Sequence, residues 1–583
     1  MKKNYVLAFV LIFLVLIAGN LLQRRNAGTT EQIQGQNGIT ATETTQPNDA
    51  LSAFVVSDSE DETDGETVAL SESTYIVETN LVRAMFTNKG GDLISYKLKR
   101  HNMAGSTENV EMIDNVTDAN RTFGISIGGY NAPLLDTIFS VKQDSTDDGE
   151  QIISFTGAVS IKNERGEVEK FKISKHYRFL PDEYLFELVV AIDGGENFSG
   201  LNYGGASYTI RTSPQIGPEW NKKDRYDFRR FSSLVSGKRK DLTLKAGQTK
   251  EAPADSSWTA VSGKYFTFVL IPDQLGGNTL FSTDNTNLSF QNENTQIFLS
   301  QPPMLTSSLQ HRYKVYIGPT GEQYVHRYSN ATKNSFGYSN LGLDSLASSS
   351  GVLSPIIFVV KNLLQFVYRL VKNWGVAIII VTVLIKLIMV PISIKSMVGT
   401  QKLQPYQGRI TEIQQKYRTN PQKMQEELNK IYTTAGYRPG CASGCLPIVV
   451  TFAVLIAMFQ LFNNYFEFRN AVFIPGWISD LSVGDSIYTL KNPIPFLNWT
   501  EIRLLPLIYV GTQYLTTLIT RQTPQNQQMQ SMMFFMMYIM PALFFFMLYD
   551  APSGLFVYWI TSNILVIFQQ CITNAIVKKE TAK

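Results

Sequence analysis

Five apolar stretches in the second half of the chain constrain its fold more than any other feature of the sequence. Each is close to the length of about 20 residues that an α-helix needs to cross a lipid bilayer. They are Trp374–Pro391, Leu446–Phe466, Leu504–Thr520, Met532–Tyr549 and Leu555–Ile576. Another apolar run, Tyr5–Leu22, follows two lysines and lacks an A-x-A cleavage pattern, which favours an uncleaved anchor over a signal peptide. The sequence therefore predicts a polytopic α-helical membrane protein with six transmembrane helices.

The first half of the chain has the composition of a soluble domain behind a tether. Residues 26–72 are rich in Gln, Thr, Gly and acidic residues and lack the apolar density to fold, so we expect a disordered acidic tether. From Tyr75 onward, alternating apolar and polar residues between turn signals predict β-strands. We therefore predict a large all-β domain over residues 73–345, a β-sandwich whose strands end near Pro319.

The sequence does not indicate catalysis, a metal or a cofactor. The β domain carries no paired-carboxylate motif, nucleophile elbow or metal cluster, and the chain has no Walker loop. The cysteines Cys441, Cys445 and Cys571 all lie in the membrane half, and the first two lack the second ligand pair that zinc needs. The net charge of +3 comes without a dense basic patch outside the membrane flanks, so we expect no sequence-specific nucleic-acid binding. We predict a protein that is not an enzyme, holds no metal and uses no cofactor.

Basic residues fix the orientation of the predicted spans. The segment after Pro391 is the most basic loop of the membrane half, and the positive-inside rule puts it in the cytoplasm, with the β domain on the opposite side. Its basic side chains include Lys402, Arg409, Lys416, Arg418 and Lys423. Apolar residues at three- and four-residue spacing, from Leu403 to Ile431 on both sides of Asn420-Pro421, predict two helices packed as a coiled-coil hairpin.

A polar stripe marks the helix that precedes the first core span. Lys361, Gln365, Arg369 and Lys372 share one face of an otherwise apolar helix, which predicts an amphipathic helix on the membrane surface. The predicted order along the chain is a transmembrane anchor 1–25, the tether 26–72, the β domain 73–345, the interfacial helix 352–373, a transmembrane helix 374–394, the cytoplasmic hairpin 395–440, a transmembrane helix 446–466, a periplasmic loop 467–502, a transmembrane helix 503–520, a cytoplasmic loop 521–530, transmembrane helices 531–549 and 555–577, and a short cytoplasmic tail 578–583.

Lys386 lies in the middle of the run Trp374–Pro391, which contains no acidic residue. A lysine at this depth costs about 2.5–3.5 kcal/mol on insertion scales, so it should face a partner or a wet cavity. The alternative is a lysine that snorkels to the interface, because Pro391 and Lys395 follow closely. Thr382 lies one turn earlier on the same helix face. Other predicted spans add the polar residues Gln513, Thr516, Thr517, Tyr558, Ser562 and Gln569. Each alone is typical of an interhelical hydrogen bond, but together with an unpaired cation they predict a hydrated cavity.

Several strings in one order resemble the YidC membrane protein insertases, a family within the insertase group of bacteria, mitochondria and chloroplasts. They are Val383–Pro391, Lys402-Leu-Gln-Pro405, Gly444-Cys-Leu-Pro447, Pro552–Asn563 and Gln569-Gln570, and Thr79–Leu93 resembles the start of the family's periplasmic domain in Gram-negative bacteria. The resemblance implies five core helices around a hydrophilic groove that is open to the cytoplasm and to lipid but sealed on the outer side. In that family a groove cation, usually arginine, receives the incoming segment, and Lys386 matches its position. Thr382 and Trp559 match groove residues that contact substrate, although tyrosine is frequent where Trp559 stands.

The resemblance also implies a location and a set of partners. The location is the bacterial inner membrane, with the β domain in the periplasm. The partners are nascent membrane proteins, the lipid bilayer, the Sec translocon, the ribosome and the signal recognition particle pathway. Because the tail 578–583 is short beside the basic tails with which some relatives touch ribosomes, ribosome docking would fall to the hairpin and to the loop Arg521–Gln530.

We therefore predict an insertase and chaperone that binds a nascent apolar segment in the groove and releases it sideways into lipid. Burial of the segment's apolar surface, worth about 25 cal/mol per Å², drives the reaction without nucleotide. One alternative is a secondary transporter with Lys386 as an ion-coupled or anion-binding group, although the chain shows no internal repeat. The other is an envelope scaffold whose β domain binds a partner while the spans serve as an anchor.

Overall fold

The computed structural model divides the chain into two compact units, residues 1–348 and 349–583. It describes residues 71–103, 106–162, 168–196, 198, 200–220, 227–283, 294–347, 353–435, 446–495, 497, 499–520 and 534–581. The predicted anchor 1–25, nearly all of the tether 26–72 and the loop 521–530 lie outside the described residues, as do Cys441 and Cys445.

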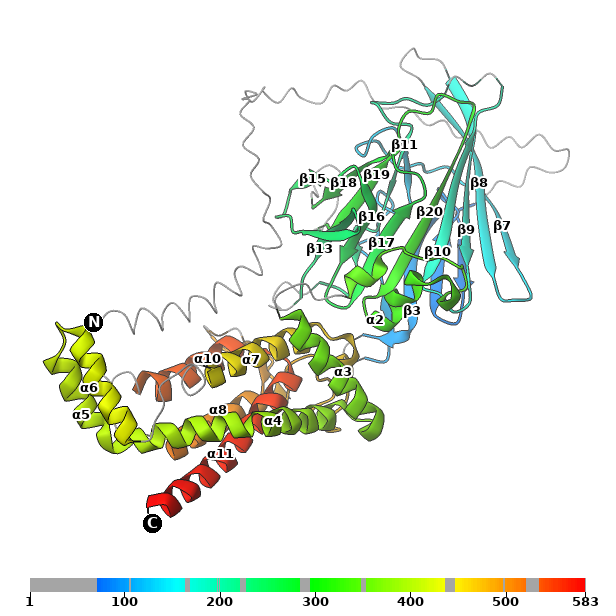
Figure 1. Ribbon diagram of the computed structural model, residues 1–583. Helices are drawn as coiled ribbons and strands as arrows, with labels where there is room; N and C mark the ends of the chain where they lie inside the picture. The colour runs from blue at the N-terminus through cyan, green and yellow to red at the C-terminus, as the bar shows by residue number, and fades with distance from the viewer. Residues whose placement is uncertain are drawn as a thin grey trace. The chain divides into compact units, whose positions relative to one another are not determined.

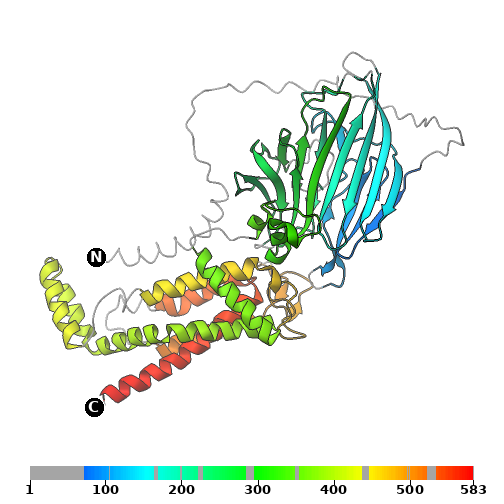
Figure 2. The same ribbon diagram turned by 45° about the vertical axis from the view of Figure 1, so that its right-hand side comes forward.

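Alternating apolar residues build a nine-stranded antiparallel sheet in the first unit (Figures 1 and 2). Its order is β14-β13-β16-β17-β20-β10-β9-β8-β7. The strands are β7 Ser140–Ser145, β8 Gln151–Lys162, β9 Val168–Phe179, β10 Leu185–Asp193, β13 Arg230–Val235, β14 Lys238–Leu242, β16 Ser256–Ser262, β17 Phe266–Pro272 and β20 Ser308–Pro319. In β9, every second residue from Phe171 to Phe179 is buried, and the residues between them are not. This period of two is expected of a sheet with one covered face.

A smaller sheet packs against the large one, with the order β15-β18-β19-β11-β6. Its strands are β6 Ile125–Ile127, β11 Tyr208–Arg211, β15 Thr249–Glu251, β18 Asn278–Ser282 and β19 Gln296–Ser300. The Tyr208 hydroxyl of β11 lies 2.8 Å from the Tyr313 hydroxyl and 2.8 Å from His311 Nδ1, both on β20. Because these buried contacts join one strand of each sheet, the two sheets face each other as a sandwich.

Short elements complete the first unit. They are β1 Thr74–Glu78, β2 Val82–Thr87, β3 Asp92–Asn102 and β4 Asn109–Glu111 in one sheet, the pair β5 Ile113–Asp114 and β12 Gln215–Ile216, and the helical turns α2 Glu322–Val325, η1 His326–Ser329, η2 Ala331–Lys333 and η3 Leu343–Leu346. The turns follow β20, and η1 is fixed because Tyr328 and Arg327 both donate to the carboxylate of Glu183, at 2.8 and 2.9 Å. The unit is β-rich, as predicted, with helical turns added after the last strand.

The core of the first unit contains a charged cluster. Lys175 Nζ lies 2.5 Å from Asp92 Oδ1, and Arg121 Nε lies 2.8 Å from Asp92 Oδ2. The side chains of Lys175 and Asp92 are each 1% exposed, and that of Arg121 is 3% exposed. Buried charges persist only when they are paired and hydrogen-bonded, so Asp92 holds both cations in the core.

The second unit is helical. Its elements are α3 Ser354–Val371, α4 Trp374–Leu403, η4 Gln404–Tyr406, α5 Gln407–Lys416, α6 Pro421–Thr434, α7 Leu446–Asn464, η5 Phe466–Phe468, β21 Tyr488–Thr489, β22 Glu501–Ile502, α8 Leu505–Thr520, the π-helical turn η6 Phe535–Ile539, α10 Met540–Leu548 and α11 Ser553–Thr581. Among the described residues, three helical segments have the length and composition to cross a membrane: Ser354–Val371, Trp374–Pro391 and Ser553–Ala575. Shorter apolar helical segments are Ala453–Asn464 and Leu505–Ile519.

Two boundaries differ from those predicted. The helix that carries Lys386 does not end at residue 394 but continues through Pro391 to Leu403, into the segment predicted as the start of the hairpin. Proline removes one backbone hydrogen bond inside a helix, and the flanking turns of α4 continue despite that loss. The last helix begins at Ser553 and reaches Thr581, so it includes most of the predicted tail.

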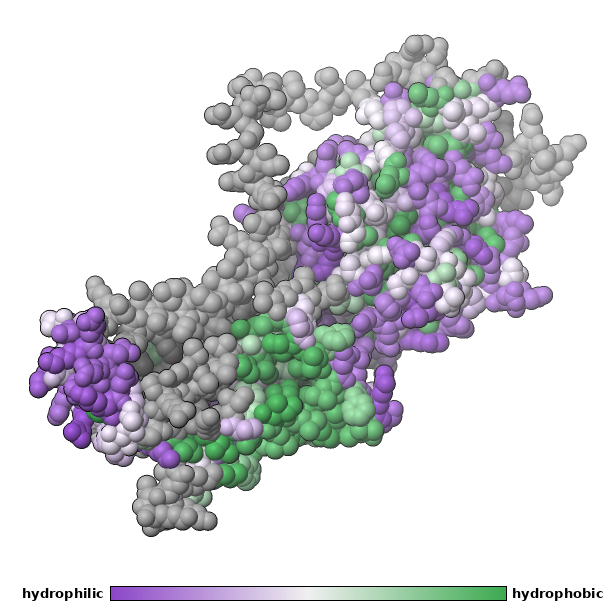
Figure 3. Space-filling view, viewed as in Figure 1, coloured by the Kyte–Doolittle hydropathy of each residue, from purple (hydrophilic) through white to green (hydrophobic). Residues whose placement is uncertain are grey.

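Helix α11 is the centre of the second unit, since it packs against α4, α8 and α7. Helix α3 packs against α4 and α7, where Gln365 Nε2 donates to the Tyr465 hydroxyl at 2.9 Å and Tyr368 stacks on Trp374 with 4.0 Å between ring centroids. Figure 3 shows apolar surface over α3 and α4, whereas the surface of α5 and α6 is polar. Exposed apolar side chains such as Phe366 and Ile388, 59% and 74% exposed, are what a lipid-facing surface requires.

Candidate functional site

Several core helices meet at one end of the bundle, which we call the loop end because residues 466–503 lie there. Helices α4, α8 and α11 start at this end and α7 finishes at it. Ser553 N donates to Val483 O at 2.7 Å, Gly554 N donates to Leu481 O at 3.0 Å, and Asn373 Nδ2 donates to Phe473 O at 3.4 Å. The loop therefore ties the starts of α4 and α11 to one level.

The bundle is tightly packed at the loop end and loosens away from it. In α4, the last described residue that is buried is Thr382; in α7, the first is Ala457. In α11, every residue of Ser553–Tyr558 is buried, and the next ten are half-buried or exposed. Along α4 and α7, the buried side chains therefore lie within about 12 Å of the loop end, at 1.5 Å per residue, and most described residues of the bundle beyond that depth are half-buried or exposed, so we call that end the open end.

Lys386 lies where this packing stops. It comes one turn after Thr382 on the same helix stripe, about 18 Å along α4 from Trp374. Its side chain is half-buried, whereas the neighbouring Leu387 is 59% exposed. None of the five apolar stretches contains another charged residue. Within the described part of the chain, Lys386 has no ion-pair or hydrogen-bond partner, so its charge is available to a ligand.

Thr382 is enclosed rather than open. Its side chain is 0% exposed, and its hydroxyl donates to Ile378 O at 2.6 Å within α4. In α8, Thr516 is also buried and Thr517 is half-buried, and their hydroxyls donate to Thr512 O and Gln513 O at 2.8 Å. Each of these hydroxyls donates its proton to a backbone oxygen of its own helix.

The polar residues of α8 lie at the same distance from the loop end as those of α4. They do not all face the same neighbouring helix. Gln513 lies about 12 Å and Thr517 about 18 Å from the start of α8, which matches the depths of Thr382 and Lys386. Thr517 lines a hollow with Tyr514, Leu518 and Tyr538, between α8 and η6. The structure therefore brings Thr517 to the η6 side of α8.

Successive residues of α11 pack against different helices. Tyr558 is 5% exposed and lies against α7, with its ring 6.4 Å from that of Phe462. Trp559 is half-buried and lies against α8, with its ring 5.0 Å from that of Tyr509. Tyr558 and Trp559 therefore do not line one surface, although both were predicted for the groove.

Ser562 and Gln569 continue along α11. Ser562 is half-buried, about 14 Å from the start of α11, and so lies between the depths of Thr382 and Lys386. Gln569 is 9% exposed, and its Nε2 has no hydrogen-bond partner among the described residues. Its neighbours Gln570 and Thr573 are also buried, so α11 has a second, polar buried patch far from the loop end.

One interhelical contact was not predicted from the sequence. Asn563 Nδ2 of α11 donates to Thr512 Oγ1 of α8 at 3.2 Å, in a part of the bundle that is otherwise half-buried. An amide hydrogen bond between helices contributes about 1 kcal/mol in a membrane. The signal in the sequence was an asparagine within a predicted span, one turn after Trp559.

Helices α5 and α6 pack against each other and carry exposed basic residues. Asn420 caps α6 by accepting from Lys423 N at 3.2 Å, and Pro421 follows at the first helical position. Of the predicted basic residues, Arg409, Lys416, Arg418 and Lys423 are exposed and Lys402 is half-buried. Their cationic heads thus lie on the surface, where a polyanion could reach them.

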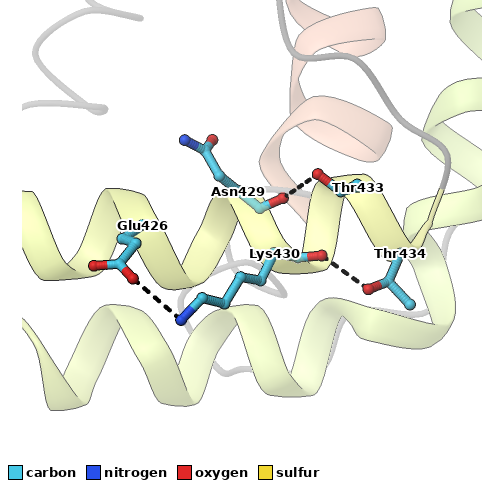
Figure 4. A pocket seen from close by; sticks show the side chains of 5 residues that line it. All are labelled: Glu426, Asn429, Lys430, Thr433 and Thr434. Carbon is cyan, nitrogen blue, oxygen red and sulfur yellow. Dashed lines mark hydrogen bonds and ion pairs between the residues drawn. The ribbon is translucent and has the colours of Figure 1, made fainter.

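The charged and hydroxyl side chains that line a hollow on α6 are paired with other groups of the same helix (Figure 4). Lys430 pairs with Glu426 at 3.2 Å and with Glu427 at 2.7 Å, while Thr433 and Thr434 donate to backbone oxygens of the same helix. The hydrogen bond from Lys430 lowers the pKa of Glu427, and the same bond raises the pKa of Lys430. The hollow therefore offers a ligand no unpaired charge.

The described residues include no group of three or more His, Cys, Asp or Glu side chains that could hold a metal ion. The chemistry of the described part of the bundle around Lys386 is that of a cation, several hydroxyl and amide groups, and apolar walls. Such an arrangement can attract an acidic or polar segment and can stabilise it beside lipid, because charges interact more strongly where water is scarce.

Comparisons with known proteins cover both units. Residues 74–340 match the family model described as the YidC periplasmic domain, and residues 366–580 match the one described as 60Kd inner membrane protein. A membrane protein insertase YidC from Treponema denticola is 45% identical over 590 residues, which cover 99% of this chain and 100% of the relative. The protein of the same name from Treponema pallidum is 36% identical over 629 residues, with the same coverage. A solved structure of an active YidC insertase covers 86% of this chain and 92% of its own, at 18% identity and a TM-score of 0.31.

Proposed function

This chain belongs to the YidC family of membrane protein insertases, and we propose that it receives an apolar segment of a nascent membrane protein beside Lys386 and releases it sideways into lipid. The activity is the transfer of a segment between environments rather than a covalent reaction. The names of the relatives support insertion and support neither the transporter nor the scaffold alternative.

One observation carries the proposal: a cation with no partner among the described residues, Lys386, lies at the boundary between the packed and the open part of the bundle. Thr382 is 0% exposed, Lys386 one turn later is half-buried, and Leu387 and Ile388 are exposed. A polar flank that enters from the open end meets Lys386 before it meets the packed loop end. The flank then binds beside the positive charge of Lys386 while the apolar segment contacts the exposed face of α4.

The energetics favour insertion without fuel. A fully buried Leu, Ile, Val or Phe side chain contributes about 1.5–3 kcal/mol, so the tens of residues in a span supply far more than one acidic residue costs. That cost is about 2.5–3.5 kcal/mol for a charge at the centre of a helix in a membrane. A lysine ammonium about 4 Å from the acidic group offsets about 1–4 kcal/mol of that cost, depending on the local dielectric constant. The protein therefore needs only to lower a barrier.

The residues around Lys386 take different parts in the proposal. Ser562 and Gln513 are half-buried at nearly the same depth and offer hydrogen bonds to the polar flank. Trp559 lies between α11 and α8, and Thr517 lies between α8 and η6, so we place both at the edges of the open part. Of the other predicted residues, Thr382 and Tyr558 are buried on the packed side of the site, and Gln569 is buried farther along α11.

The location follows from the family and from the predicted orientation. We assign the protein to the bacterial inner membrane with six spans, its β-rich unit in the periplasm and the α5–α6 pair in the cytoplasm. The apolar helical segments of the second unit support this assignment. The exposed cations of α5 and α6 are suited to contact a ribosome, and partnership with the Sec translocon or the signal recognition particle pathway belongs to the same proposal.

The proposal is tested by insertion of a small single-span protein with an acidic N-terminal tail into liposomes that contain the purified chain. Protection of the tail from added protease is the readout. We expect protection well above that of empty liposomes, and equal protection in both would contradict the proposal.

The same vesicles separate the alternatives. Counterflow of a labelled solute would favour a transporter. A chain without residues 72–319 should still insert the test protein, whereas a scaffold built around the β-rich unit would lose its activity with that deletion.

A further inference from the structure

At the loop end, a buried carboxylate, that of Asp485, joins the loop to the start of α8. Asp485 is 3% exposed and lies in the loop between α7 and α8. Its Oδ2 accepts hydrogen bonds from Leu504 N at 2.8 Å, Leu505 N at 3.1 Å and Trp477 Nε1 at 3.0 Å. Two of these donors are backbone groups at the start of α8, where a helix has unpaired N–H groups and favours negative charge.

The backbone next to Asp485 reaches a second helix. Val483 O accepts from both the N–H and the hydroxyl of Ser553, the first residue of α11, at 2.7 Å each. Only Gly484 separates Val483 from Asp485, and a Cβ at Gly484 would collide with the guanidinium of Arg503. The loop thus holds the start of α11 with its backbone and the start of α8 with its carboxylate, two residues apart.

Arg503 adds a third helix to this junction. Its Nη1 donates to Asp485 O at 3.0 Å, and its Nη2 lies 2.8 Å from Glu501 and 3.3 Å from Asp550, just after α10. The Asp550 side chain is 57% exposed, so that ion pair is a surface contact. The buried part of the junction therefore depends on Asp485, and the exposed part contributes little.

We infer that Asp485 is a positioning residue that keeps the loop end of the bundle closed while the other end is open. The inference rests on the proposed function, because a closed end matters only if the open end admits a polar segment and water. Lys386 lies about 18 Å along α4 from its start, and the first 12 Å or so of that length, up to Thr382, is the packed part that separates Lys386 from the loop end. Without the carboxylate, α8 is released from the loop that also holds α11, and water can pass through the junction.

The test compares proton leak in proteoliposomes that contain a pH-sensitive dye and the full-length chain. The variants are Asp485→Leu, which removes the acceptor at similar volume, Asp485→Asn, which keeps one oxygen, and Asp550→Asn as the matched loss of an exposed charge at the same end. We expect leak to rise severalfold in Asp485→Leu and less in Asp485→Asn, with Asp550→Asn like wild type.

A folded Asp485→Leu protein that leaks like wild type would overturn the inference. If Asp485→Leu is not recovered as a monodisperse protein, Asp485→Asn decides, and wild-type leak in that variant overturns the inference. Equal leak in Asp550→Asn and the Asp485 variants would also overturn it. Insertion of the acidic-tailed test protein is measured in parallel. Failure of wild type to insert contradicts the proposed function, whereas unchanged leak in the Asp485 variants contradicts only the role of Asp485.

Discussion

Replacing Lys386 with methionine should make the bundle more stable and the protein less active. Lys386 is half-buried in a helix predicted to span the membrane, and no described residue pairs with its charge. A lysine at the centre of a span costs about 2.5–3.5 kcal/mol. Because the side chain is only half-buried, we expect about 1–2 kcal/mol of that cost to remain. Methionine has a similar length without the charge, so it should recover this free energy.

The assay is unfolding of the purified full-length chain in mixed micelles by added SDS, followed by circular dichroism. Lys423→Met is the control, because Lys423 is exposed on α6 and surface substitutions usually change stability by less than about 0.5 kcal/mol. A Lys386→Met variant that is as stable as wild type, or less stable, would refute the reasoning. Lys386 would then have a partner worth as much as its desolvation.

Three further predictions concern stability. Asp92→Asn leaves Lys175 without its ion pair in the core and Arg121 with only its pair to Asp136, so the β-rich unit should lose about 3–5 kcal/mol in urea unfolding of the full chain; a loss below about 1 kcal/mol would contradict a coupled cluster. Burial lowers the pKa of His311 from 6.5, so the unfolded chain binds a proton first as the pH falls, and this unit should lose stability below about pH 6.5; the same pH dependence in His311→Gln would contradict that origin. Gln365→Leu should cost about 1 kcal/mol in SDS unfolding, and an unchanged midpoint would mean that α3 docks without its bond to Tyr465.

The elements with a clear period could be predicted from the sequence. Alternation identified strands such as β10, which spans Leu185–Asp193, and apolar length identified α4, α8 and α11. The segment 374–394 was predicted from its apolar length, which does not show where the helix itself ends, and α4 continues through Pro391 to Leu403.

The site was predicted less completely, for a physical reason. Helical spacing shows that Thr382 and Lys386 share a face, but not where the packing of that face stops, so Thr382 was expected in the groove and is fully buried. Tyr558 was predicted from the polar residues of the last span and Trp559 from the family resemblance, and because a helix turns about 100° between adjacent residues the two rings meet different helices. The role of Asp485 depends on a loop that meets two helix starts, which no local pattern encodes.

The central claim is that the charge of Lys386 receives the polar flank of an inserting segment. The most direct test is a charge exchange: wild type and Lys386→Glu are compared in the liposome assay with a single-span protein whose tail is acidic or, at the same positions, basic. The account predicts that wild type inserts the acidic tail better and that Lys386→Glu inserts the basic tail better. The same order of preference in both proteins would contradict it.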